Sequence, residues 1–164
     1  MKKLLLLIVF IGFSAIAQES SALLEKEKVK SKLSVSMLRE LKSSLKTNYG
    51  KDLDSLKVIA IYYYQPKVNC PNSDVYKFIK PEKEEPKDKK YIKSDLLYLC
   101  FEKGIASKYI KYDVGATVYN AFFSENRGCE GTVCVTSDGN YILVKSRASV
   151  STVNKFLEEL TGRR

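Results

Sequence analysis

The chain has 164 residues, and its 28 lysines and arginines outnumber its 19 acidic residues, which gives a net charge of +9. A chain of this length usually forms one domain with a hydrophobic core of its own. Histidine is absent, which excludes Ser-His-Asp and Cys-His catalytic sites and removes the commonest metal ligand. Zinc would need close pairs of cysteine or histidine, so we expect neither a metal nor another cofactor.

Residues 1–17 have the pattern of a secretory signal peptide. A cationic start at residues 1–3 precedes an apolar run at 4–13 and a small-x-small cleavage motif at 15–17. The apolar run is shorter than the roughly 20 residues that a membrane span requires. We therefore expect cleavage before Gln18, a periplasmic or extracellular mature protein without a transmembrane anchor, and no nucleic-acid partner.

Residues 18–56 are predicted to form a basic amphipathic helix, over 20–48, and its connection to the rest of the chain. Apolar residues recur at helical spacing on one face of this segment: Leu33, Met37, Leu38, Leu41 and Leu45. Basic residues lie around the other side: Lys32, Arg39, Lys42 and Lys46. We expect this helix to pack on the domain with its basic face in solvent, and weak contact with a membrane surface is the alternative.

Residues 57–164 are predicted to form an α/β domain. The runs 58–64 and 96–101 lack polar alternation, which is typical of strands buried on both faces. Between them, we expect a short helix at 74–79 and an exposed, charged loop at 80–93 that contains two prolines. A helix is expected within 105–123.

The end of the chain carries the clearest local signals. Segments 132–136 and 141–145 predict a hairpin, because Asp138-Gly139 between them is a strong turn signal. An apolar stripe from Val150 to Leu160 predicts a C-terminal helix capped by Ser149 or Ser151. The fold class that follows is a single small α/β domain, with a mixed sheet of about four strands flanked by helices.

The four cysteines are Cys70, Cys100, Cys129 and Cys134. An even number of cysteines in an exported chain indicates disulfides, because that environment is oxidising. Three pairings can be drawn, and the sequence does not choose among them. The short separation between Cys129 and Cys134 favours a small ring there, with Cys70 bonded to Cys100.

Residues 70–73 read Cys-Pro-Asn-Ser and follow a buried strand. Together with the order of helices and strands from 58 to 160, they resemble the thioredoxin-like superfamily in a C-x-x-S, single-cysteine form. The resemblance implies that Cys70 is the reactive cysteine at the start of a helix, where the pKa of a thiol is lowered. Ser73 replaces the second active cysteine, and residues 130–131 stand where the family has a cis-proline.

Two functions follow from these observations. The first is a non-catalytic, extracytoplasmic binding or interaction module in which the cysteines form structural disulfides and no residue is catalytic. The alternative is a divergent thiol-disulfide protein that uses Cys70. We expect the first, because cysteines of exported proteins are mostly structural.

Overall fold

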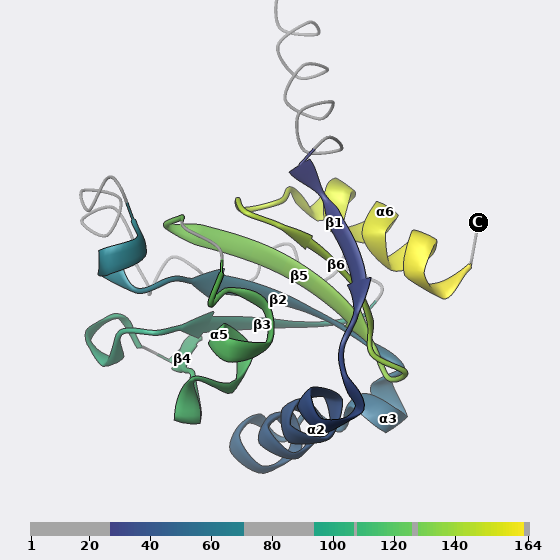
Figure 1. Cartoon of the computed structure of the whole chain (residues 1–164), viewed down its shortest axis with the longest axis horizontal. Coiled ribbons are helices and arrows are strands. Elements are labelled where there is room, and N and C mark those ends of the chain that lie inside the picture. Colours follow the sequence, from purple (N-terminus) through teal and green to yellow (C-terminus); the bar gives the residue numbers. More distant parts are fainter. Residues whose placement is uncertain (1–26, 71–93, 107, 126–127, 163–164) are drawn as a thin grey trace, which may run out of the picture.

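The computed structural model describes residues 27–70, 94–106, 108–125 and 128–162. Within these ranges the chain forms one sheet of six strands, in the order β1-β6-β5-β2-β3-β4 (Figure 1). The strands are β1 (Val29–Lys32), β2 (Val58–Tyr64), β3 (Asp95–Cys100), β4 (Ile110–Tyr112), β5 (Glu130–Thr136) and β6 (Asn140–Val144). The α-helices are α2 (Val35–Tyr49), α3 (Leu53–Leu56), α5 (Thr117–Phe122) and α6 (Val150–Thr161).

The sheet is mixed. Strand β3 pairs in parallel with both β2 and β4, whereas β2–β5, β5–β6 and β6–β1 are antiparallel pairs. The predicted α/β class with a mixed sheet is therefore confirmed. The predicted number of about four strands is wrong, because β1 and β4 extend the sheet at its two edges. The predicted thioredoxin-like order of elements is wrong as well, because β1 precedes α2 and β4 lies where part of a helix was expected.

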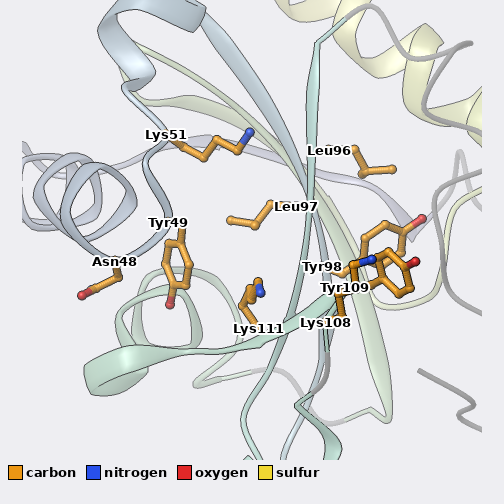
Figure 2. Close-up of a pocket in the computed structure, with 9 residues that line it drawn as sticks. All are labelled: Asn48, Tyr49, Lys51, Leu96, Leu97, Tyr98, Lys108, Tyr109 and Lys111. Carbon is orange, nitrogen blue, oxygen red and sulfur yellow. The ribbon is translucent and has the colours of Figure 1, made fainter. Parts of the chain in front are cut away.

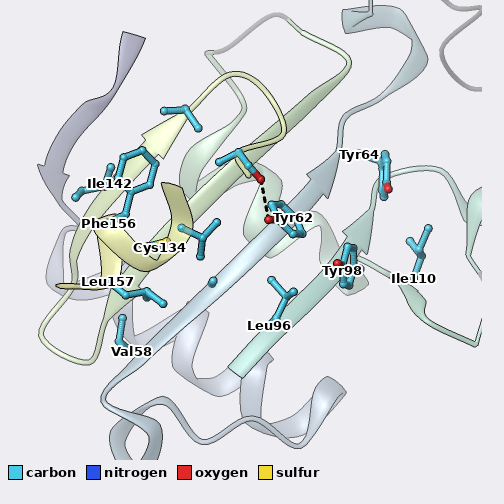
Figure 3. Packing of buried hydrophobic residues seen from close by; sticks show 14 of the residues in the cluster. Val58, Tyr62, Tyr64, Leu96, Tyr98, Ile110, Cys134, Ile142, Phe156 and Leu157 are labelled. Atoms are coloured by element: carbon cyan, nitrogen blue, oxygen red, sulfur yellow. Dashed lines mark hydrogen bonds between the residues drawn. The ribbon is translucent and has the colours of Figure 1, made fainter. Parts of the chain in front are cut away.

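Helices cover both faces of the sheet (Figure 1). Successive residues of β2 point to opposite faces, so Ala60 and Tyr62 join one core while Ile59 and Ile61 join the other. The first core is closed by α6 through Phe156 and Leu157, together with the residues drawn in Figure 3. The second core is closed by α2, α3 and α5, which contribute the side chains of Leu41, Leu45, Leu53, Val118 and Phe122. The architecture of the described residues is a three-layer α/β/α sandwich.

The start of α2 differs from the prediction. The predicted helix ran from 20 to 48, but Val29–Lys32 forms β1 against β6, and the part before residue 27 lies outside the described residues. Ser34 stops the helix from extending further back, because its Oγ accepts a hydrogen bond from the amide of Met37 as an N-cap. Lys32 is therefore a strand residue, and its pairing with β6 outweighs the local helical pattern.

The C-terminal end of α2 follows the prediction. Gly50 adopts φ 67°, the left-handed conformation that favours glycine, and its amide donates to the carbonyls of Leu45 and Lys46. Leu41 and Leu45 are fully buried. The apolar side of the helix therefore belongs to the core, as expected for a helix that packs on the domain.

The segment after β3 contains no long helix in its described residues. Instead it forms the 3-10 turn η4 (Lys103–Ile105), then β4, the turn η5 (Val114–Ala116) and the six-residue α5. Gly115, inside η5, has φ 70°, and the following Ala116 is the N-cap of α5 with φ 52°, so the chain bends before α5 begins. The prediction of one helix within 105–123 was thus correct only for its end.

The other predicted elements are found where they were expected, with small shifts in their ends. Strands β2 and β3, the β5–β6 hairpin and α6 all form, and α6 begins at an N-cap, Ser149, whose side chain accepts from the amide of Thr152. The predicted helix at 74–79 and the charged loop at 80–93 lie outside the described residues.

Candidate functional site

Cys70 is bonded to Cys129, with their Cα atoms 4.2 Å apart. Cys70 ends the turn η1 (Lys67–Asn69), and Cys129 directly precedes β5. The antiparallel β2–β5 ladder brings the two together: Tyr64 is opposite Glu130, and the next pair is joined by a hydrogen bond from the amide of Gln65 to the carbonyl of Cys129, 3.0 Å long.

The predicted pairs Cys70–Cys100 and Cys129–Cys134 are therefore wrong. A ring between Cys129 and Cys134 requires a turn, but Glu130–Thr136 is an extended strand. Five residues of strand span about 17 Å, well beyond the separation that a disulfide can bridge.

Cys100 and Cys134 are free thiols with no exposed surface. Burial raises the pKa of each to about 12, and the neighbouring carboxylates of Asp113 and Glu102 add to the shift at Cys100. The Cys100 Sγ also donates to the carbonyls of Glu102 and Lys111. Because the thiolate is the reactive form, neither cysteine is suited to nucleophilic chemistry.

A buried carboxylate, Asp113, organises the turn before α5. It accepts hydrogen bonds from the Tyr63 hydroxyl at 2.9 Å and from the amides of Tyr119 and Val118 at 2.9 and 3.3 Å. Burial raises the pKa of Asp113, although these donors counteract the shift in part. Since Asp113 is 1% exposed and its partners belong to the fold, we interpret it as a structural group.

A pocket of about 310 Å³ lies at the edge of the sheet beside β3 and β4. Figure 2 shows its lining: the end of α2 on one side of β3, and the approach to β4 on the other. The lining residues are Asn48, Tyr49, Lys51, Leu96, Leu97, Tyr98, Lys108, Tyr109 and Lys111. Its floor is therefore aliphatic and aromatic, and three lysines surround it.

The three lysines differ in what they contact. The Nζ of Lys51 is 2.9 Å from Oδ2 of Asp95, in an ion pair of two half-buried side chains. Lys108 is exposed, with its Nζ 5.3 Å from the centre of the Tyr109 ring. Lys111 is also exposed, and no acidic residue is among the described residues that line the pocket.

Tyr49 lines the pocket, and its hydroxyl forms two hydrogen bonds with the backbone. That hydroxyl donates to the carbonyl of Tyr112 and accepts from the amide of Val114, both at 3.0 Å. Burial raises the pKa of Tyr49 to about 12, so the phenol stays neutral near neutral pH. The positive charge of the lysines is not cancelled by this residue.

Sequence reasoning identified Cys70 and Cys129 as disulfide residues but missed this pocket. Lys108 and Lys111 were part of a segment predicted as a helix, and Lys51 was part of a connection. Only the pairing of β4 with β3 brings them to one place. Residues 108–112 read Lys-Tyr-Ile-Lys-Tyr, which does not alternate polar and apolar residues, so this segment carries no local signal of a strand.

The described parts of the chain also lack two kinds of feature. They hold no group of three or more cysteine, aspartate or glutamate side chains arranged to bind a metal ion. None of their helices has the length and apolar character needed to cross a membrane. Comparison of the chain with protein-family models, with curated proteins and with solved structures gave no match.

Proposed function

We propose that this chain is a non-catalytic, exported binding module, and that it holds an organic anion in the pocket at the β3–β4 edge. The observation that carries the proposal is the convergence of two exposed lysines, Lys108 and Lys111, on an apolar and aromatic floor. Lys51 also lines the pocket, with its charge balanced by Asp95. The Cys70–Cys129 disulfide is compatible with an oxidising location outside the cytoplasm.

The chemistry of the lining favours an anion with an apolar or aromatic part. Leu97 and the rings of Tyr49 and Tyr109 offer surface to such a group. Lys108 and Lys111 are exposed, so water and salt screen their charges, and each contributes modestly. Binding therefore depends on both parts of the ligand, and it weakens as salt concentration rises.

The test compares a carboxylate with its neutral analogue. We expect 4-phenylbutyrate to bind with a Kd of about 1 mM, the affinity that typical ligand efficiency gives for about 12 non-hydrogen atoms. The corresponding amide should bind at least about threefold more weakly, because it lacks the charge. Ligand-observed NMR measures both affinities at two salt concentrations.

Two double variants separate the pocket from general basicity. Lys108→Gln/Lys111→Gln should weaken binding of the carboxylate by about three- to tenfold. The control Lys145→Gln/Lys155→Gln removes the same charge from exposed lysines outside the pocket lining and should leave the affinity unchanged. Equal losses in the two variants, or equal binding of acid and amide, would refute the proposal.

A second candidate function is thiol–disulfide exchange through Cys70, as the thioredoxin-like resemblance implies. The position of Cys70 after β2, in a disulfide with the half-buried Cys129, favours it. In such a reaction a partner thiolate attacks Sγ of Cys129, the bond to Cys70 breaks, and Cys70 leaves as a thiolate.

The exchange hypothesis predicts that the oxidised protein is reduced quickly by a dithiol. Dithiothreitol and alkylation, followed over time by mass spectrometry, measure the rate for the folded protein. Reduction that occurs only in denaturant would identify the disulfide as structural and exclude this second function.

A further inference from the structure

The outer edge of β3 is only partly paired. Strand β2 pairs with all six residues of β3, from Asp95 to Cys100. On the other side, β4 pairs only with Tyr98, Leu99 and Cys100. In the described part of the chain, no strand lies beside the first half of β3 on that outer side, and the pocket is found there.

Backbone hydrogen bonds show which groups of β3 face outward. The amide of Phe101 donates to the carbonyl of Tyr64 on the β2 side, and the carbonyl of Cys100 accepts from the amide of Asp113 on the β4 side. Alternate residues of a strand direct their backbone groups to the same neighbour. The amide and carbonyl of Leu96 therefore point outward, toward the pocket.

The pocket reaches this edge from both faces of the sheet. Leu96 belongs to the core under α6 and Leu97 to the core under α2, yet both line the same pocket. Figure 2 shows their side chains on opposite sides of β3. A pocket lined by two successive residues of one strand lies at the edge of the sheet and not over one face.

We propose that an extended, acidic segment of a partner protein binds here as an added strand beside the first half of β3. This inference rests on the proposed function, because it names the kind of anion that the same pocket takes. Strand addition would supply hydrogen-bond partners to the outward groups of Leu96, as in other cases of β-augmentation.

The lysines are distributed to suit such a strand. Lys111 is opposite Leu99 in the register and so lies on the face of Leu97 and Tyr49. Figure 2 shows Lys108, which precedes β4, on the side of β3 where Leu96 lies. Successive residues of an added strand point to opposite faces. Of two adjacent acidic residues in such a strand, one would therefore lie on the face of Lys111 and the other on the face of Lys108.

The same charges disfavour a second copy of this chain. Lysine at a sheet edge is a common protection against edge-to-edge pairing of identical chains, and here two copies would bring their lysines together. An acidic strand is favoured instead, because its negative charge complements the positive charge of the lysines at this edge.

The test uses a fluorescent eight-residue peptide of valine and threonine with two adjacent glutamates at its centre. Fluorescence anisotropy measures its binding to the whole mature protein. We expect the peptide with two glutamines in their place to bind about three- to tenfold more weakly. Lys108→Gln/Lys111→Gln should cause a similar loss, and Lys145→Gln/Lys155→Gln should cause none.

Two N-methylated peptides test for a strand specifically. A methyl group on a backbone amide that faces β3 removes a hydrogen bond, whereas one on the next amide points away from the sheet. We expect one of the two neighbouring methylated peptides to lose at least about tenfold in affinity and the other to bind like the parent. Equal binding of both would overturn strand addition.

The outcomes separate this inference from the proposed function. If 4-phenylbutyrate binds and the peptides show no alternation, the pocket takes anions but not a strand, and only this inference fails. If neither probe binds, both proposals fail. A concentration-dependent dimer in sedimentation, undisturbed by the peptide, would assign the edge to a second copy and also overturn the inference.

Discussion

Asp113 is the residue at which burial and hydrogen bonding compete most directly. Desolvation disfavours its charged form, while the Tyr63 hydroxyl and two amides favour it. Burial prevails, so the pKa of the folded state lies above its ordinary value of 3.8. A carboxyl group with a raised pKa contributes most to stability when it is protonated, and that contribution is lost as pH rises through the folded-state pKa.

This balance gives a prediction for Asp113→Asn. The variant has no charge to titrate, so the stability of the wild type relative to it should fall as pH rises from 3 through the folded-state pKa of Asp113. The loss amounts to about 1.4 kcal/mol for each unit by which the pKa is raised. Urea unfolding of both proteins at a series of pH values measures it. A relative stability that grows with pH would mean that the hydrogen bonds prevail and the pKa is depressed.

At the scale of elements, local signals were reliable where packing agreed with them. The fully apolar run of β2, the Asp-Gly turn of the β5–β6 hairpin and the capped stripe of α6 all predicted what forms. The segment Val29–Lys32 was wrongly predicted as helix. It forms a strand only because it pairs with β6, which is more than 100 residues away in sequence and leaves no local signal. Strand β4 was missed for the same reason: its three residues form a strand only beside β3.

The contact between β5 and the end of α5 gives a second prediction. A β-carbon at Gly131 would overlap the ring of Phe123, which is fully buried. Gly131→Ala should therefore lower the free energy of unfolding by about 1–3 kcal/mol through overpacking. Gly104→Ala is the matched control, since nothing lies within 4 Å of a β-carbon there. Chemical denaturation compares the two, and equal effects would contradict this packing.

For the whole molecule, the sequence predicted the class of fold. It did not predict the cysteine pairing or the pocket, which depend on how distant segments pack together. The cysteine pairing follows from the antiparallel β2–β5 ladder, which places Cys129 beside the end of β2. The pocket likewise depends on three separate segments: the end of α2, the first half of β3 and the approach to β4. Neither arrangement has a local signature in the sequence.

The Cys70–Cys129 bond gives a third prediction. It joins residues separated by 59 positions, so it restricts the unfolded chain strongly and should stabilise the fold by about 4 kcal/mol in the loop-entropy description. Cys70→Ser/Cys129→Ser should lose this amount in guanidinium unfolding. Reduced wild type should behave like the variant, and the variant should ignore reductant. A loss below about 1 kcal/mol would show that the bond does not hold the fold together.

The central claim is that the basic, aromatic pocket at the β3–β4 edge is the binding site of this protein. Protein-observed NMR tests it most directly, because it shows where 4-phenylbutyrate binds. We predict salt-sensitive shifts at the amides of the pocket lining, from the end of α2, the first half of β3 and the start of β4. Shifts confined to the exposed basic side of α2, around Arg39 and Lys46, or no shifts at all, would contradict the claim.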